Sequence, residues 1–227
     1  MKKEKIRVLG IHSSPVRNGN TESLLRHALE EAEKEGAVET ELLSLRGLEI
    51  KDCVHCNWCM KKQTAEKLCS ISDDALPVLG KIRDCDVLVL ASPVYFGRLS
   101  GTMACLIDRT RCFIFGREKP MALRGKAGVA LTVGWLRNGG IETTLESLHL
   151  AFLVHEMWTP SVHRTGSFFG AGAVSGGRFD PESPLLALKD GDALQGAAAL
   201  IHKAVRMAFD SPALSPEKNG KGTAGSN

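Results

Sequence analysis

The sequence has no apolar run that approaches the ~20 residues a helix needs to cross a membrane. It also lacks an excess of charge, since 29 basic and 26 acidic side chains leave a formal net charge of +3, too little to indicate a nucleic-acid surface. The basic N-terminus precedes an apolar stretch shorter than the ~7–15 residues of a secretory signal core. These absences predict a cytoplasmic protein that binds neither membrane nor nucleic acid.

Two nucleotide-binding motifs are also missing, because neither G-x-G-x-x-G nor G-x-x-x-x-G-K-[ST] occurs. No internal repeat and no second core-forming segment is visible. The composition is ordinary for a globular protein, with 43% hydrophobic and 24% charged residues. We therefore expect one domain over residues 1–210 and a disordered polar tail over residues 211–227.

Apolar strand-like runs alternate with segments of helical periodicity along most of the chain. The run Asp86–Ser92 is continuously apolar, as a strand buried on both faces should be. This alternation predicts a flavodoxin-like, doubly wound α/β fold with a five-stranded parallel sheet and helices on both faces. The expected strands are 5–11, 39–45, 86–92, 126–134 and, last, 157–162; the expected helices are 21–36, 73–84, 101–115, 141–154 and 192–209, with a glycine-rich loop over 165–190.

The loop after the first expected strand, "SSPVRNGNTES", leads into the N-terminus of a helix. Free N–H groups and the helix dipole attract anions there. Hydroxyls, an amide and a cation accompany them, so the loop suits a phosphate monoester: Ser13, Ser14, Arg17, Asn20 and Thr21. The alternative is a solvated turn with Asn20 or Thr21 as the N-cap.

Two further strands end in loops that suit a flat ligand. The third ends in "SPVYFGRLSG", which places Tyr95 and Phe96 at the sheet edge, and the fourth ends in "TVGWLRNGG". Glycines at such positions let the backbone approach a ligand closely. Ligands of doubly wound sheets bind at this carboxyl edge of the strands.

Together, "SSPVRNGNT", "SPVYFG" with "IDR" at 107–109, and "TVGWLRNGG" resemble the NADPH-dependent FMN reductase superfamily over residues 5–155. The resemblance implies FMN, with the phosphate held by Ser14, Arg17, Asn20 and Thr21. It further implies an isoalloxazine lined by Pro93, Val94, Tyr95, Phe96 and Gly97, and a pyrimidine edge along Thr132, Gly134, Gly139 and Gly140. Val16 departs from the family, which usually has arginine there.

Four of the seven cysteines fall between Cys53 and Cys69 with the spacing C-x2-C-x2-C-x9-C. A reducing compartment disfavours a disulfide, and structural zinc sites usually present two separated pairs. The tight x2 spacings resemble the cysteine run of bacterial ferredoxins. We therefore expect Cys53, Cys56, Cys59 and Cys69 to ligate a [4Fe–4S] cluster, with zinc or free thiols as alternatives. The cysteine-rich insertion at 52–72 also resembles the iron–sulfur flavoprotein branch of the superfamily.

These features predict an FMN-dependent oxidoreductase that moves electrons between FMN and the cluster. The insertion leaves the second strand at the flavin edge, so we expect the two groups within electron-transfer reach. The alternatives are an NAD(P)H-dependent FMN or quinone reductase without a cluster, and a non-enzymatic flavin electron carrier. Expected partners are NAD(P)H, a small-molecule acceptor or a redox protein, and further copies of the chain in a homodimer or homotetramer.

Overall fold

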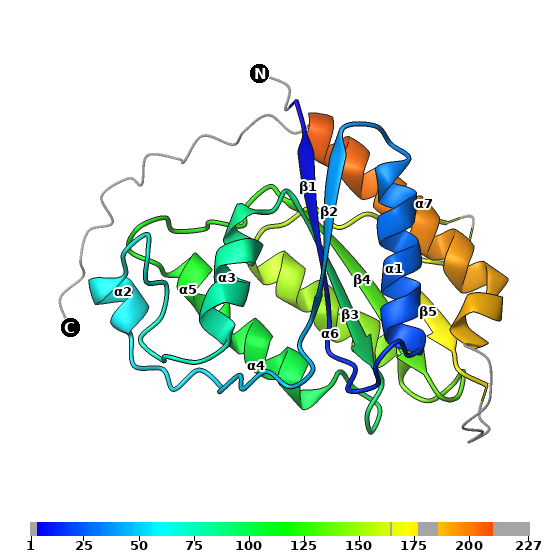
Figure 1. The fold of residues 1–227 in the computed structure, drawn as a ribbon, viewed down its shortest axis with the longest axis horizontal. Coiled ribbons are helices and arrows are strands. Elements are labelled where there is room, and N and C mark those ends of the chain that lie inside the picture. Colours follow the sequence, from blue (N-terminus) through cyan, green and yellow to red (C-terminus); the bar gives the residue numbers. More distant parts are fainter. Residues whose placement is uncertain (1–3, 164, 177–185, 211–227) are drawn as a thin grey trace, which may run out of the picture.

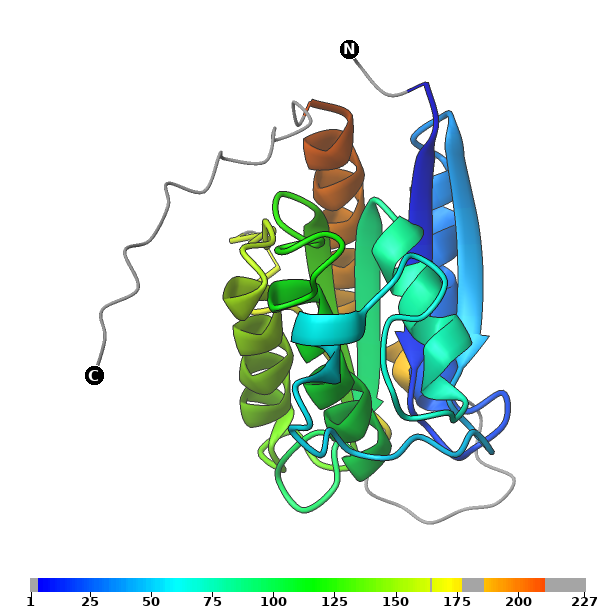
Figure 2. The same cartoon turned by 90° about the vertical axis from the view of Figure 1, so that its left-hand side faces the viewer.

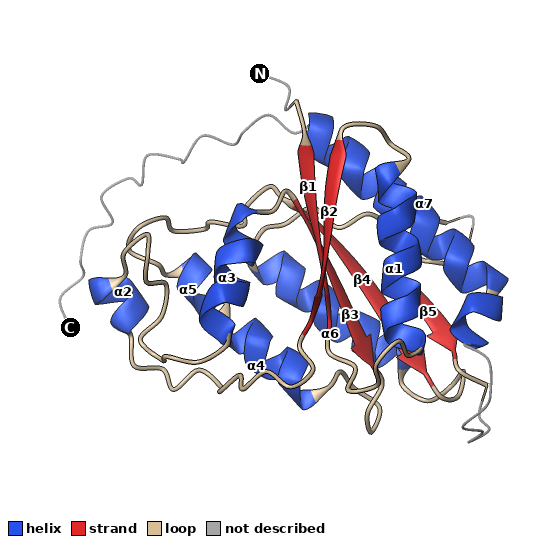
Figure 3. Ribbon diagram, viewed as in Figure 1, coloured by secondary structure: helices blue, strands red, loops and turns tan. Residues whose placement is uncertain are grey.

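Five parallel strands form one sheet in the order β2-β1-β3-β4-β5, with helices on both faces (Figures 1 and 3), which confirms the predicted flavodoxin-like α/β fold. The computed structural model describes residues 4–163, 165–176 and 186–210, so the tail expected at 211–227 lies outside the described residues. The elements are β1 (Ile6–His12), α1 (Asn20–Glu33), β2 (Val38–Ser44), α2 (Trp58–Lys62), α3 (Ala75–Asp84), β3 (Val87–Pro93), α4 (Gly101–Arg109), α5 (Arg111–Ile114), β4 (Ala127–Gly134), α6 (Ile141–Val154), β5 (Ala171–Val174), the 3-10 turn η1 (Leu186–Lys189) and α7 (Gly191–Asp210).

The sheet separates two apolar cores, because successive residues of each strand point to opposite faces. In β3, Val87 and Val89 belong to the core under α1 and α7. Leu88 and Leu90 belong to the core under α3, α4, α5 and α6. Every residue of β3 is buried, which explains why this strand reads as one continuous apolar run.

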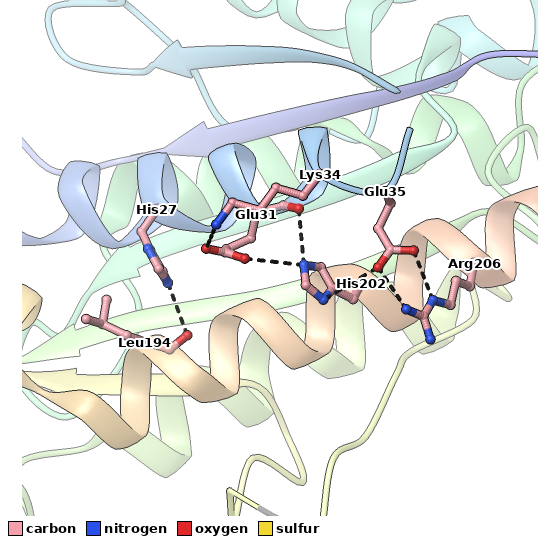
Figure 4. Close-up of polar contacts among 7 residues, drawn as sticks. All are labelled: His27, Glu31, Lys34, Glu35, Leu194, His202 and Arg206. Carbon is pink, nitrogen blue, oxygen red and sulfur yellow. Dashed lines mark hydrogen bonds and ion pairs between the residues drawn. The ribbon is translucent and has the colours of Figure 1, made fainter. Parts of the chain in front are cut away.

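Polar contacts tie α7 to α1 above the first of these cores (Figure 4). The Nε2 atom of His27 lies 3.2 Å from the carbonyl oxygen of Leu194. Farther along, the Arg206 guanidinium donates two hydrogen bonds to Glu35, just past the end of α1. The C-terminal helix is therefore an integral layer of the domain. No helix among the described residues is long and apolar enough to cross a membrane.

The expectation of a last strand at residues 157–162 is wrong. Only Trp158 pairs there with the start of β4, and its carbonyl oxygen accepts a 2.8 Å hydrogen bond from Gly128. Pro160 follows and has no N–H for a ladder. The chain then leaves the sheet and returns as β5, inside the segment expected to be a loop. Gly172 of that segment serves packing, because a Cβ there would lie 2.3 Å from the side chain of Ile141.

The helix expected at 101–115 is broken in two at Thr110. The hydroxyl of Thr110 donates to the carbonyl of Ile107 at 2.5 Å and also contacts His155. Side-chain bonds of this kind compete with regular helical bonding. The break sets Arg109 at the end of α4 and Arg111 at the start of α5, and both contact the cysteine-rich insertion, at Ile71 and Asn57.

Candidate functional site

The three ligand loops predicted from the sequence follow β1, β3 and β4, whose carboxyl ends meet at one edge of the sheet (Figure 2). The loop after β1 begins with buried Ser13 and Ser14, continues with exposed residues 15–18 and ends with buried Gly19 before α1. The Ser14 hydroxyl accepts a hydrogen bond from the N–H of Val16 at 3.2 Å, which turns the chain. Arg17 is exposed, and Thr21 is buried in the first turn of the helix.

The side chain of Asn20 has a structural partner. Its Oδ1 atom accepts a 2.9 Å hydrogen bond from the N–H of Ala187 in η1. The carbonyl half of the amide therefore anchors η1. The α1 N-cap, Gly19, provides no side-chain cap. The N–H groups of the first turn are thus left for another acceptor.

A buried carboxylate holds this loop from within the fold. Glu22 accepts hydrogen bonds from the N–H of Asn18 at 2.9 Å and from Arg26 at 3.0 Å. Its Oε2 atom lies 3.7 Å from Nε2 of His12, a fully buried imidazole. Burial opposes ionisation, but these donors and His12 lower the pKa of the Glu22 carboxyl. The sequence reading assigned Glu22 no role, because an acid in a first helical turn is an ordinary feature.

A buried hydroxyl network joins the three strand ends. The hydroxyl of Ser100, the N-cap of α4, donates to the Ser13 hydroxyl at 2.7 Å. The Ser100 N–H donates to the Ser92 hydroxyl at 2.9 Å, and Thr132 donates to the Ser92 carbonyl at 2.8 Å. The hydroxyl of Thr132 is thus used inside the protein. The sequence reading missed Ser92 and Ser100, although a serine before a helix signals an N-cap.

The loop after β3 forms a tight hairpin. Tyr95 and Arg98 exchange two backbone hydrogen bonds, of 2.8 and 3.1 Å. Phe96 and Gly97 between them have φ angles of 49° and 76°, and two positive values are typical of a type I′ turn. Phe96 projects at the tip with its side chain fully exposed. The hairpin therefore presents aromatic surface beside Pro93 and Val94, as predicted.

The loop after β4 lies against this hairpin. Gly134 ends the strand, and the N–H of Gly139 donates to the carbonyl of Leu136 to close a turn. Gly140 follows at a φ angle of 108° and meets the backbone of Gly97. The structure thus places the residues predicted to hold FMN along one edge, and whether each contacts FMN stays a prediction.

The cysteine-rich insertion turns away from this edge. From the end of β2 it runs back beneath α4 to α2 (Figure 1). There the carbonyl of Cys59 accepts a 3.0 Å hydrogen bond from the N–H of Arg117. The buried amide of Gln63 donates to the carbonyl oxygens of Leu68 and Cys112. The insertion is therefore packed against α5 and the segment that follows it.

The nine-residue gap before Cys69 folds back on itself. Its first residues continue α2, and Thr64 and Lys67 then close a turn through reciprocal hydrogen bonds of 3.1 Å. Gln63 holds the returning segment through Leu68, which is buried. The long gap is thus a compact turn that returns Cys69 toward the other cysteines.

Three of the four thiols, those of Cys53, Cys59 and Cys69, lie close enough together to interact. Burial first, and then the proximity of Cys69 and Cys53, raise the pKa of the Cys59 thiol, while Arg111 opposes the rise. The Cys56 sulfur lies 3.2 Å from the hydroxyl of Ser70, beside Cys69 in the chain. This hydrogen bond and the N–H of Trp58 lower the pKa of Cys56.

The other three cysteines are poor ligands, because their thiols resist ionisation. Burial raises the pKa of Cys85 to about 11 and that of Cys112 to about 12. Burial also raises the pKa of Cys105, which lies on α4. Among the residues that the structure describes, no group of three His, Cys, Asp or Glu side chains converges as on a single metal ion.

A parallel sheet in this strand order, with loops suited to a phosphate and a flat ring along its carboxyl edge, defines a flavodoxin-like protein. Residues 6–167 match the NADPH-dependent FMN reductase family. The chain belongs to this family, in its iron–sulfur flavoprotein branch, and is a flavin oxidoreductase that uses FMN.

Two relatives place it in that branch. An iron–sulfur flavoprotein of Methanocaldococcus jannaschii is 40% identical over 170 residues, which are 73% of this chain and 83% of that protein. An iron–sulfur flavoprotein of Methanosarcina thermophila is 35% identical over 152 residues, or 67% and 75% of the two chains. A WrbA-like flavodoxin from Agrobacterium tumefaciens shares the fold, with a TM-score of 0.60 and 16% identity, over 92% of this chain and all of that one.

Proposed function

We propose that this protein moves electrons between FMN at the carboxyl edge of the sheet and a [4Fe–4S] cluster bound by the insertion. Cys53, Cys56, Cys59 and Cys69 hold the cluster. One observation carries the proposal: the folded nine-residue gap brings Cys69 back to Cys59 and Cys53, and Ser70 to within 3.2 Å of the Cys56 sulfur, with Arg111 beside Cys59 and Arg109 beside Cys69. The names of the two archaeal relatives support the same cofactor.

The donor set fits an anionic cluster. Four thiolates around iron and sulfide carry net negative charge, which nearby cations offset. The NH1 group of Arg111 lies 3.7 Å from the Cys59 sulfur, and its NH2 group donates to Asn57 at 2.8 Å. Arg109 lies beside Cys69 and is fully buried. These residues suit thiolates better than neutral thiols.

In the proposed flavin site, three loops divide the contacts. Helix α1 and its loop bind the phosphate, the β3 hairpin provides backbone N–H groups to the ring, and the β4 loop follows the pyrimidine edge. The residues are Ser14, Arg17, Asn20 and Thr21 for the phosphate, Pro93, Val94, Tyr95, Phe96 and Gly97 for the ring, and Thr132, Gly134, Gly139 and Gly140 for the pyrimidine edge. FMN exchanges electrons singly or in pairs and the cluster singly, so the pair links one-electron and two-electron partners.

Because the insertion runs away from the flavin edge of its own subunit, we infer that electrons pass between subunits of a homodimer or homotetramer. Apolar side chains on α6 support such an assembly. Leu150, Leu153 and Val154 are 53%, 52% and 62% exposed, and grouped exposed apolar residues mark interaction surfaces. The cluster of one subunit would then face the flavin of another.

NAD(P)H, a small-molecule acceptor and a redox protein are the proposed redox partners, in a cytoplasmic setting. A second function has its own support. The family description names an NADPH-dependent FMN reductase, and in this second function the cysteines bind zinc or nothing. A non-enzymatic flavin carrier has no such support.

Protein purified without oxygen separates the two functions. The proposal expects about four irons and four sulfides per chain, one FMN, and a broad visible absorbance that bleaches on reduction. Replacing Cys56 by alanine should remove iron and sulfide and leave FMN bound. Cys85→Ala, which alters a buried thiol outside the motif, is the matched control and should keep both cofactors. Stoichiometric zinc without sulfide in the wild-type protein, together with rapid oxidation of NADPH, would establish the reductase instead.

A further inference from the structure

Arg109 is the largest fully buried side chain of the protein's described part, with 1% of the residue exposed. It is the last residue of α4, and its NH1 group donates to Asp73 at 2.6 Å. Both side chains are almost inaccessible, at 0% and 2%. Removing two charges from water is costly, so a buried pair is weak evidence for stability alone. The position of the pair indicates a more specific role.

The guanidinium spans the neck of the cysteine-rich insertion, where the chain enters it at Lys51 and leaves it at Ile71. Its NH1 group also donates to the carbonyl of Lys51 at 3.0 Å, and its NH2 group donates to the carbonyl of Ile71 at 3.3 Å. Asp73 in turn accepts the N–H of Lys51 at 3.0 Å. The bonded residues lie two positions before Cys53 and two after Cys69. One side chain from another element therefore closes the loop that carries all four thiols.

The Nε–H donor of Arg109 is unused. Its Nε–H is buried and has no hydrogen-bond partner among the residues that the structure describes. A buried donor without an acceptor costs free energy. Burial lowers the pKa of the Arg109 guanidinium, but Asp73 and then Cys69 raise it. The Cys69 sulfur therefore lies beside this group. Cys69 is thus the thiol that a donor on Arg109 can serve.

We propose that Arg109 is a positioning residue that closes the neck of the cysteine-rich insertion before any cluster is present, and that its free Nε–H then donates to the cluster-bound sulfur of Cys69. The second half rests on the proposed [4Fe–4S] function, and the first half does not. A hydrogen bond to a ligating sulfur, together with the positive charge, stabilises the reduced and more negative cluster. Arg109 thereby both assembles the site and sets its potential.

Hydrogen exchange on the metal-free chain tests the neck. In Arg109→Gln, amides of residues 51–73 should exchange about tenfold faster or more, because local opening loses its restraint. Arg83→Gln is the matched control: its guanidinium also bonds the insertion, at the carbonyl of Ala65, but from the surface. Arg83→Gln should change the exchange of the amides of residues 51–73 much less than Arg109→Gln does. Unchanged hydrogen exchange in Arg109→Gln would show that Arg109 does not close the neck of the insertion.

The midpoint potential of the cluster tests the donor. It should become more negative in Arg109→Gln, and Arg109→Lys, which keeps the charge, should recover part of the shift. Asp73→Asn removes the counter-charge and should shift the potential the other way, which a purely structural pair would not do. A potential equal to wild type in Arg109→Gln would overturn the donor half.

A double variant keeps the test valid if Arg109→Gln alone fails to fold. Arg109→Gln with Asp73→Asn leaves no unpaired buried charge, and bound FMN reports that the rest of the domain is intact. This double variant should still exchange faster at 51–73. If the wild-type protein binds zinc without sulfide, the proposed function fails. The hydrogen-exchange experiment alone then tests whether Arg109 closes the neck of the insertion.

Discussion

A Cβ atom on Gly140 would lie 2.4 Å from the Cα of Gly97. The two glycines lie 43 residues apart in the sequence. The hairpin after β3 and the loop after β4 are therefore packed backbone against backbone. Gly140 has a φ angle of 108°, which a side chain would also disfavour. The shape of the carboxyl edge, where FMN is proposed to bind, therefore depends on a glycine at position 140.

Replacing Gly140 by alanine should separate the two loops. Strain of this kind costs about 1–3 kcal/mol, and titration should show FMN affinity falling by about tenfold or more. Gly101→Ala is the control at the same edge, because no atom lies within 4 Å of its added Cβ. Its effect on stability should stay within about 0.5 kcal/mol. Equal affinity in wild type and Gly140→Ala would show that the contact does not shape the flavin site.

The phosphate assignment predicts a difference between FMN and riboflavin, which lacks the phosphate. Thr21→Val removes a hydroxyl at nearly constant volume, and Asn20→Asp keeps the acceptor for Ala187 but adds negative charge. Each should weaken FMN binding by about 1–3 kcal/mol, the worth of a hydrogen bond to a charged group. Riboflavin binding should change little. Equal losses for the two ligands in calorimetry would place the phosphate elsewhere.

His155 predicts acid sensitivity of the fold. Burial lowers the pKa of its imidazole to about 4 from 6.5. Between these values the unfolded chain binds a proton that the folded chain excludes, so stability is lost as the pH falls from 6.5 toward 4. The full loss is about 3 kcal/mol. Denaturant unfolding of His155→Gln at pH 7.5 and 4.5 should show a smaller drop than wild type.

The matched control for this pH dependence is His163→Gln, which replaces an exposed imidazole. It should unfold with the same pH dependence as the wild-type protein. A drop in stability that is identical in His155→Gln and wild type would assign the acid sensitivity to other groups.

The proposed assembly predicts a particle larger than the 24.5 kDa chain. Light scattering at micromolar concentration should give at least twice that mass. Leu150→Glu, on the exposed face of α6, should lower it by placing charge in the apolar contact. Glu146→Gln, on the same helix, is the control and should keep the wild-type mass. A wild-type particle of 24.5 kDa would contradict electron transfer between subunits.

The sequence by itself determined the alternation of the first four strands with helices and the position of the ligand loops. Continuous apolar runs such as Asp86–Ser92 and helical periodicity are local signals, and they need no knowledge of distant partners. The cysteine spacing is equally local. It indicated the four candidate ligands, although the cluster itself remains a proposal.

Tertiary structure alone decided what depends on distant partners. β5 consists of small residues that read as a loop, and it is a strand only because β4 is open beside it. Arg109 and Asp73 are 36 positions apart, and Ser13 and Ser100 are 87 apart. No periodicity links such pairs, since each forms only when separate elements pack. The same packing turned the cysteine-rich insertion away from the flavin edge, because Gln63 finds its partners beside α5 and not beside the strand ends.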